Sequence, residues 1–229
     1  MIKAFIFDLD GVLISTDKYH YLAWKNIADK LNIPFDENDN NALRGVSREE
    51  SLELILKKKE GTALSLSPAE KKKLLDYKNS LYRASLSLLK PENVDKDVRN
   101  TLITLKKQGY KTGLGSSSKN ARYILEKADL FQYFDAITDG SDISKSKPDP
   151  QVFTMTAERL NVKAEECAVV EDSRSGIDAA LSGKMLAIGI GDAKDYKKTQ
   201  YPISFIKDLL SLTEILKNDG FIKIDDMVF

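Results

Sequence analysis

The chain opens with the stretch IKAFIFDLDGV, residues 2–12. Its first six residues are mostly apolar and rich in β-formers, which predicts a strand buried within a parallel sheet. Asp8 and Asp10 follow directly, and Gly11 then permits a sharp turn. Side chains two apart in an extended chain point the same way, and ligands of α/β sheets bind beyond the carboxyl ends of the strands. We therefore expect both carboxylates at the mouth of a site.

Similar short apolar runs recur later in the chain and alternate with helical patterns. We expect further strands over residues 111–114, 134–137, 167–170 and 185–189. We expect helices over residues 97–108, 120–128 with Ser118 as N-cap, 150–160 opened by Asp149-Pro150, and 173–182. This alternation predicts an α/β fold, with a Rossmann-like parallel sheet as its core and helices on both faces.

Residues 16–90 interrupt this alternation, because they contain helical patterns and no convincing strand. We expect a helix over residues 17–31, one from a capping box at Ser47 to residue 59, and one from a capping box at Ser67 to about residue 87. We therefore predict two domains. Residues 1–15 and 91–229 would form the α/β core, and residues 16–90 would form a small α-helical cap inserted into it.

The composition excludes several classes of protein. The 229 residues are 42% hydrophobic and 31% charged, as in a globular protein, and the formal net charge is zero. Nucleic-acid binders usually carry a basic excess, and a membrane span needs roughly 20 apolar residues, which no run approaches. Cys167 is the single cysteine, so no internal disulfide is possible. We expect a cytoplasmic monomer that binds neither nucleic acid nor membrane.

Polar groups follow the later predicted strands, at the same edge of the sheet as Asp8. Ser116 lies in a loop of small residues that would receive phosphate oxygens, although its serines also suit simple capping. Lys147, in a proline-stiffened loop, would neutralise an aspartate and a phosphoryl group, unless it is an ordinary surface lysine. Glu171 and Asp172 add a second acidic pair, and Asp172 also suits N-capping of the next helix.

Two adjacent carboxylates repel each other, so both ionise only beside a cation or with a shared proton. Mg²⁺ prefers such hard oxygen ligands. With the metal in place, one carboxylate could attack phosphorus while the other exchanges protons with the attacking or leaving oxygen. For Asp8 and Asp10 alone, the alternative is a loop with a helix-capping aspartate.

In this order along the chain, Asp8-x-Asp10, Ser116, Lys147 and Glu171-Asp172 resemble the four signature motifs of the haloacid-dehalogenase-like phosphotransferases. The inserted helical block resembles their small α-helical cap. Within this superfamily, several local strings are similar to those of the β-phosphoglucomutases. They are residues 7–12, Tyr19-His20, Ala23-Trp24, residues 45–49, Lys78-Asn79, and residues 118–120, 134–137 and 171–177.

The resemblance implies a Mg²⁺-dependent enzyme that interconverts β-D-glucose 1-phosphate and glucose 6-phosphate. Asp8 would be the nucleophile that becomes an aspartyl phosphate, and Asp10 the general acid and base. Glucose 1,6-bisphosphate would be the intermediate. The metal ligands would be Asp8, the main-chain carbonyl of Asp10, and Asp172, with Glu171 binding directly or through water.

It also implies that Ser116 and Lys147 bind the transferring phosphoryl group, with Ser117 and Asn120 beside it. Arg48 of the cap would bind the distal phosphate. The remaining substrate-binding residues would be His20, Trp24, Lys78, and Gly45, Val46, Ser47 and Ser51 of one loop. Taken alone, Arg48 suits a solvent-facing arginine, His20 a half-buried helix residue and Trp24 simple packing. The loop of residues 115–118 has more hydroxyl groups than we expect for the mutases.

Two alternatives follow from the same residues. A phosphatase on the same scaffold would pass through the same aspartyl phosphate and differ only in its attacking water. A receiver-type phosphoacceptor domain would also use acidic residues, a serine and a lysine, but it lacks an inserted cap. A P-loop kinase is disfavoured because its glycine-rich motif is absent from the sequence. The tail of residues 221–229 suits an added strand, a dimer contact or a frayed end.

Overall fold

The structure, a computed structural model, describes residues 1–43, 46–58 and 66–218. Its strands are β1 (Ala4–Phe7), β2 (Lys111–Gly115), β3 (Ala136–Thr138), β4 (Cys167–Glu171), β5 (Leu186–Gly189) and β6 (Tyr201–Pro202). Its α-helices are α1 (Asp17–Lys30), α2 (Glu37–Ala42), α3 (Arg48–Lys57), α4 (Pro68–Leu86), α5 (Lys96–Lys107), α6 (Ala121–Lys127), α7 (Gln151–Leu160), α8 (Arg174–Ser182) and α9 (Asp208–Asn218). Short 3₁₀ turns connect some of them.

The strands form one parallel sheet in the order β3-β2-β1-β4-β5-β6. The first strand of the chain lies inside the sheet, with β2 on one side and β4 on the other. In register, Phe7 is opposite both Leu114 and Val170. The polar residues that follow β2 and β4 therefore lie beside those that follow β1, although both sets are more than a hundred residues from Asp8 in the sequence. The predicted parallel α/β fold is confirmed.

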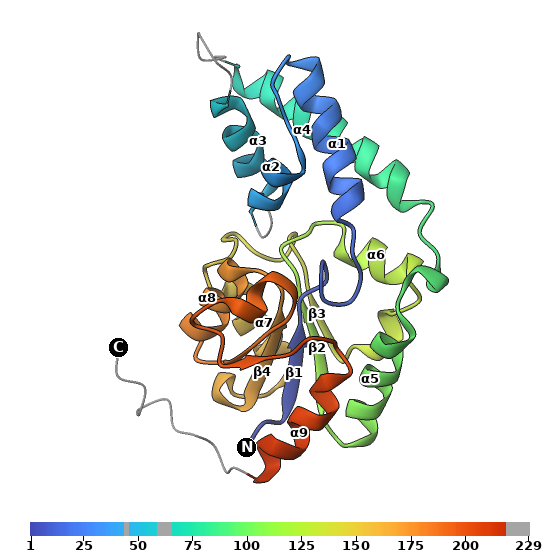
Figure 1. Cartoon of the computed structure of the whole chain (residues 1–229), viewed down its shortest axis with the longest axis vertical. Coiled ribbons are helices and arrows are strands. Elements are labelled where there is room, and N and C mark those ends of the chain that lie inside the picture. The colour runs from blue at the N-terminus through green and yellow to red at the C-terminus, as the bar shows by residue number, and fades with distance from the viewer. Residues whose placement is uncertain (44–45, 59–65, 219–229) are drawn as a thin grey trace.

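Both faces of the sheet are covered, which explains why its strands are mostly apolar. Phe5 and Phe7 face one hydrophobic cluster, which includes Leu102 of α5 and Leu209 of α9. Ala4 and Ile6 face a second cluster, which includes Phe153 of α7 and Ile177 of α8. Figure 1 shows α5 and α9 on one side of the sheet and α7 and α8 on the other.

Helices α1 to α4 form a separate block beyond the carboxyl ends of the strands (Figure 1). They have a hydrophobic cluster of their own, which contains Trp24, Ile27, Leu52 and Ile55. The N-terminus of α4 has the complete predicted capping box, since Ser67 accepts the N–H of Glu70 while the Glu70 carboxylate accepts that of Ser67. At α3, the Ser47 hydroxyl accepts the N–H of Glu50 at 3.2 Å.

Several element boundaries differ from the sequence predictions. Helix α6 begins at Ala121 and has Asn120 at its N-cap, so the prediction that Ser118 caps it is wrong. The Ser118 hydroxyl instead accepts the N–H of Asn120 at 3.2 Å, as part of a turn that precedes the helix.

Three elements of the structure, helix α2, helix α9 and strand β6, were not predicted. Residue 59 and the tail lie outside the described residues. No helix in the described part of the chain is long and apolar enough to cross a bilayer.

Candidate active site

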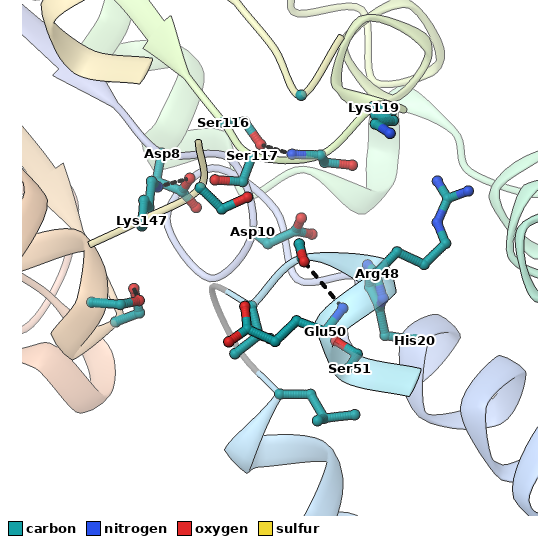
Figure 2. Close-up of a pocket in the computed structure, with 18 of the residues that line it drawn as sticks. Asp8, Asp10, His20, Arg48, Glu50, Ser51, Ser116, Ser117, Lys119 and Lys147 are labelled. Atoms are coloured by element: carbon teal, nitrogen blue, oxygen red, sulfur yellow. Dashed lines mark hydrogen bonds and ion pairs between the residues drawn. The ribbon is translucent and has the colours of Figure 1, made fainter. Parts of the chain in front are cut away.

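A cavity of about 700 Å³ lies between the carboxyl ends of the strands and the helical block. The predicted site residues that the structure describes all contribute to its lining, and Gly45 lies outside the described residues. From the sheet these residues are Asp8, Asp10, Ser116, Ser117, Asn120, Lys147, Glu171 and Asp172. From the helical block they are His20, Trp24, Val46, Ser47, Arg48, Ser51 and Lys78. Figure 2 shows Asp8 and Lys147 on one side of this cavity and Arg48 and His20 on the other.

A buried lysine joins two carboxylates at the base of the cavity. The Nζ atom of Lys147 lies 2.6 Å from Oδ1 of Asp8 and 2.5 Å from Oε1 of Glu171. Burial raises the pKa of Asp8 to about 7, although the Lys147 charge opposes this. Burial alone would lower the pKa of Lys147, but the two carboxylates raise it overall. The ammonium is therefore a fixed positive charge beside Asp8.

Asp172 completes a cluster of acidic groups with Asp8 and Glu171. One oxygen from each of the three buried carboxylates lies within 4.8 Å of the others. Lys147 supplies one positive charge against these three groups, which leaves an excess of negative charge when all are ionised. Closely spaced carboxylate oxygens are the donors that Mg²⁺ prefers. The residues present therefore fit a divalent cation.

Two glycines make room for this cluster. Gly11 has a φ of +77°, and a Cβ atom there would lie 2.0 Å from Oδ2 of Asp172. A Cβ atom on Gly176, in the first turn of α8, would lie 1.9 Å from Oε1 of Glu171.

The other oxygen of Glu171, Oε2, accepts the N–H of Ser173 at 2.6 Å and the hydrogen bond of the Ser173 hydroxyl at 2.9 Å. Both oxygens of Glu171 are thus already held.

The loop after β2 presents hydroxyl groups to the same cavity. Ser116 is buried, and its hydroxyl accepts the N–H of Ser118 at 3.2 Å. The Ser117 hydroxyl oxygen is buried and has no hydrogen-bond partner among the described residues. A Cβ atom on Gly140 would lie 2.2 Å from the Ser117 carbonyl oxygen, so the loop after β3 packs tightly on this backbone. An unpaired buried hydroxyl costs about 1–3 kcal/mol, and a ligand oxygen would relieve that cost.

Asp10 lies at the junction between the sheet and the helical block. Its Oδ1 accepts a hydrogen bond from the hydroxyl of Thr16, and the hydroxyl of Tyr82 lies 2.9 Å from that of Thr16. Burial raises the pKa of Asp10 to about 6, although the hydrogen bond from Thr16 opposes this. A carboxyl group with a pKa near neutrality is suited to general acid–base chemistry.

Four side chains of the helical block pack closely together. The Nζ atom of Lys78 lies 2.9 Å from Nδ1 of His20 and sits over the rings of Trp24 at 4.8 Å and Tyr82 at 4.7 Å. Burial lowers the pKa of Lys78 to about 7, and the charge of Arg48 adds to this. Burial, Lys78 and Arg48 together hold the pKa of His20 well below its usual value. His20 is therefore neutral near pH 7.

The sequence analysis missed several residues of the site. Thr16 and Tyr82 hold Asp10. From the sequence, a tyrosine on a helix suggests only ordinary packing, and Thr16 is 66 residues away from it. Asn79 and Arg83 of α4 contact Asn120, since Asn120 Nδ2 donates to Asn79 Oδ1 at 3.0 Å and Arg83 Nη1 donates to Asn120 Oδ1 at 3.5 Å. No local sequence pattern indicates such contacts between distant segments.

The site thus brings together a buried aspartate, a fixed ammonium and an acidic cluster at the ends of parallel strands. The chain belongs to the haloacid dehalogenase-like hydrolase family, whose model matches residues 2–183. It is an enzyme of this family. Among its relatives is a β-phosphoglucomutase from Bacillus subtilis, 44% identical over 192 residues that span 84% of each chain.

Two further relatives extend the comparison. A phosphorylated carbohydrates phosphatase from Thermotoga maritima is 33% identical over 186 residues, which cover 79% of this chain and 81% of that protein. The crystal structure of a β-phosphoglucomutase from Clostridium difficile superposes with a TM-score of 0.89 at 35% identity, covering 97% of this chain and 100% of that one. The fold and the family are shared by mutases and phosphatases.

The buried charge of Lys78 leads to a prediction about stability. Between pH 7 and its ordinary pKa of 10.5, the unfolded chain binds a proton at Lys78 that the folded protein does not. Through this group, the free energy of unfolding therefore rises with pH, and below pH 7 the folded protein buries the full charge. Lys78→Met removes this dependence. Relative to the unchanged protein, the variant should gain most stability near pH 6, and the gain should shrink by more than about 1 kcal/mol by pH 9.

Urea unfolding at pH 6, 7.5 and 9 measures this difference. Lys72→Met is the matched control, because Lys72 lies on the same helix with its side chain 77% exposed. Its stability difference should not change with pH. A constant difference for Lys78→Met would show that Lys78 is charged in the folded protein throughout this range.

Proposed function

We propose that this chain is a Mg²⁺-dependent β-phosphoglucomutase that interconverts β-D-glucose 1-phosphate and glucose 6-phosphate. The observation that carries the proposal is one cavity lined by cationic side chains from both the sheet and the helical block, which would suit a phosphate at each end. Asp8, Lys147 and Ser116 would form one phosphate site at the sheet, and Arg48 would provide the other from the helical block. A hydrolase needs the first alone. A mutase needs both, because its bisphosphate intermediate carries a phosphate at each end. The Bacillus relative supports this choice.

We also propose that residues 16–90 act as a cap domain over a core of residues 1–15 and 91–229. The separate hydrophobic cluster of helices α1 to α4 supports this division. Such a cap would exclude water from the aspartyl phosphate and leave a sugar hydroxyl as the attacking group. The substrate would be a small phosphorylated sugar, and the protein would act as a monomer.

In the proposed reaction, an Asp8 oxygen forms a bond to phosphorus while the bond from phosphorus to the sugar oxygen breaks. Asp10 gives its proton to that leaving oxygen. The ammonium of Lys147 and the Ser116 hydroxyl balance the charge on the phosphoryl oxygens. This step acts on the bisphosphate and releases the monophosphate product. Before it, the aspartyl phosphate has given its phosphoryl group to the free hydroxyl of the substrate, Asp10 has taken the proton of that hydroxyl, and the resulting bisphosphate has turned around.

Asp8, Asp172 and the main-chain carbonyl of Asp10 would hold Mg²⁺. Glu171 would act through water, because Lys147 and Ser173 already engage its two oxygens. When bound, the metal would neutralise charge that develops on the phosphoryl group.

The acidic cluster predicts that Mg²⁺ binding depends on Asp172. Asp172→Asn removes one of the three closely spaced carboxylates. It should weaken Mg²⁺ binding by at least about 10-fold, as measured by isothermal titration calorimetry, and lower activity in parallel. Asp192→Asn, a change to an exposed carboxylate, is the control and should bind Mg²⁺ normally. Equal Mg²⁺ affinity in the Asp172 variant would contradict this ligand set.

Phosphorus NMR tests the proposed reaction directly. The protein is mixed with Mg²⁺ and β-glucose 1-phosphate, with and without a trace of glucose 1,6-bisphosphate. Conversion to glucose 6-phosphate that depends on the bisphosphate would support the mutase. Release of inorganic phosphate alone would instead select a phosphatase. That second function is a real candidate, because the Thermotoga relative is a phosphorylated carbohydrates phosphatase.

The two-phosphate cavity makes a prediction for Arg48. Losing a charge-assisted contact to a distal phosphate costs about 2–5 kcal/mol in a desolvated site. Arg48→Ala should therefore reduce mutase kcat/KM by about 30-fold or more. Phosphorylation of Asp8 by acetyl phosphate should hardly change, since that donor has no distal phosphate.

Both activities are measured in the same preparations, beside a Lys57→Ala control. Lys57 is exposed at the opposite end of α3 and should affect neither activity. If Arg48→Ala lowers both activities equally, Arg48 supports the fold. An unchanged mutase rate would remove Arg48 from the site altogether.

A further inference from the structure

A buried chain of hydroxyl groups connects helix α4 to Asp10. Thr16 is fully buried and Tyr82 is 1% exposed. The Tyr82 hydroxyl lies 2.9 Å from the Thr16 hydroxyl, which in turn donates to Oδ1 of Asp10. Tyr82 belongs to the helical block, whereas Asp10 lies in the loop after the first strand of the sheet. This chain of hydroxyl groups therefore crosses from the helical block to the loop after β1.

Proton counting fixes the direction of both hydrogen bonds. The Thr16 hydroxyl has one proton, and it is donated to Asp10. The contact between Thr16 and Tyr82 then requires the Tyr82 hydroxyl to be the donor and Thr16 the acceptor. Burial and the nearby Asp10 charge raise the pKa of Tyr82, so its hydroxyl keeps the proton that this arrangement needs.

The ring of Tyr82 is itself held in place. The His20 ring packs against it with 4.1 Å between the ring centroids, and Lys78 Nζ lies 4.7 Å from its centroid. The phenol oxygen therefore has a defined position relative to α1 and α4. A rigid donor at this position prevents the Thr16 hydroxyl from rotating away from Asp10.

We propose that Tyr82 is a positioning residue for the acid–base step, which acts through Thr16 to hold the Asp10 carboxyl group in one orientation. Thr16 engages Oδ1, and Oδ2 is left to face the sugar oxygen. This inference rests on the proposed role of Asp10. Loss of the Tyr82 hydroxyl should slow only some reactions, because only leaving groups that need a proton depend on the orientation of Asp10.

Tyr82→Phe removes the donor and keeps the ring, and two phosphoryl donors reveal the effect. A sugar phosphate must release an alkoxide, which requires a proton. Acetyl phosphate releases acetate, which leaves without one. We expect kcat with the sugar phosphate to fall by about 10-fold or more with KM little changed, since a general acid contributes about 10²–10⁴-fold. Phosphorylation of Asp8 by acetyl phosphate should stay within about twofold of the unchanged protein.

Two further variants complete the experiment. Tyr77→Phe changes a partly exposed tyrosine of the same helix and should alter neither reaction. Thr16→Val should reproduce the selective loss, and the double variant with Tyr82→Phe should be no slower than Thr16→Val alone, because both act through one chain. Thr16→Ser, which keeps the hydroxyl, should restore most of the rate.

An equal fall with both donors, or an additive double variant, would show that Tyr82 only supports the fold. An unchanged rate with the sugar phosphate would overturn the proposal. The comparison uses whichever sugar phosphate the unchanged protein turns over, since hydrolysis of a sugar phosphate also releases an alkoxide. If the mutase assignment fails, the unchanged protein itself will not convert β-glucose 1-phosphate to glucose 6-phosphate. If this proposal fails, only the ratio of the rates with the sugar phosphate and with acetyl phosphate in the variants will show it.

Discussion

The burial of negative charge at the carboxyl ends of three parallel strands constrains the whole site. Asp8, Glu171 and Asp172 cannot all ionise in a dry environment without compensation. The Lys147 ammonium supplies part of it, since it lies within hydrogen-bonding distance of both Asp8 and Glu171. A divalent metal would balance the remaining excess of charge. The same excess opposes the approach of a phosphate, unless cations and hydrogen-bond donors surround the cavity.

The helical block supplies a second group of cations, placed away from the first. Arg48 and Lys78 line the opposite side of the cavity, and burial, with the charge of Arg48 added to it, lowers the pKa of Lys78. A bound dianion would relieve the repulsion between these two charges, so substrate binding and the position of the helical block should be coupled. Asp10 lies where the sheet meets the helical block. Thr16 donates a hydrogen bond to it, and the Tyr82 hydroxyl contacts that of Thr16.

The sequence predicted the sheet and its edge well, because the polar motifs come after apolar strands in the sequence and parallel strands end together. It did not predict Thr16 and Tyr82 as a pair, since their contact joins segments 66 residues apart. The assignment of Lys78 and His20 to the cavity came from family resemblance, because a lysine and a histidine on helices have no pattern that indicates burial. Helix α9 and strand β6 were missed, and a two-residue edge strand leaves almost no periodicity to detect.

The proposed reaction depends most directly on Asp8 as the carrier of the phosphoryl group. The protein is incubated with Mg²⁺ and acetyl phosphate, reduced with borohydride to convert an aspartyl phosphate into homoserine, and digested for peptide mass spectrometry. We expect homoserine at position 8 and at no other acidic residue. Homoserine at Asp10 or Asp172, or none in a preparation that turns over a sugar phosphate, would contradict it.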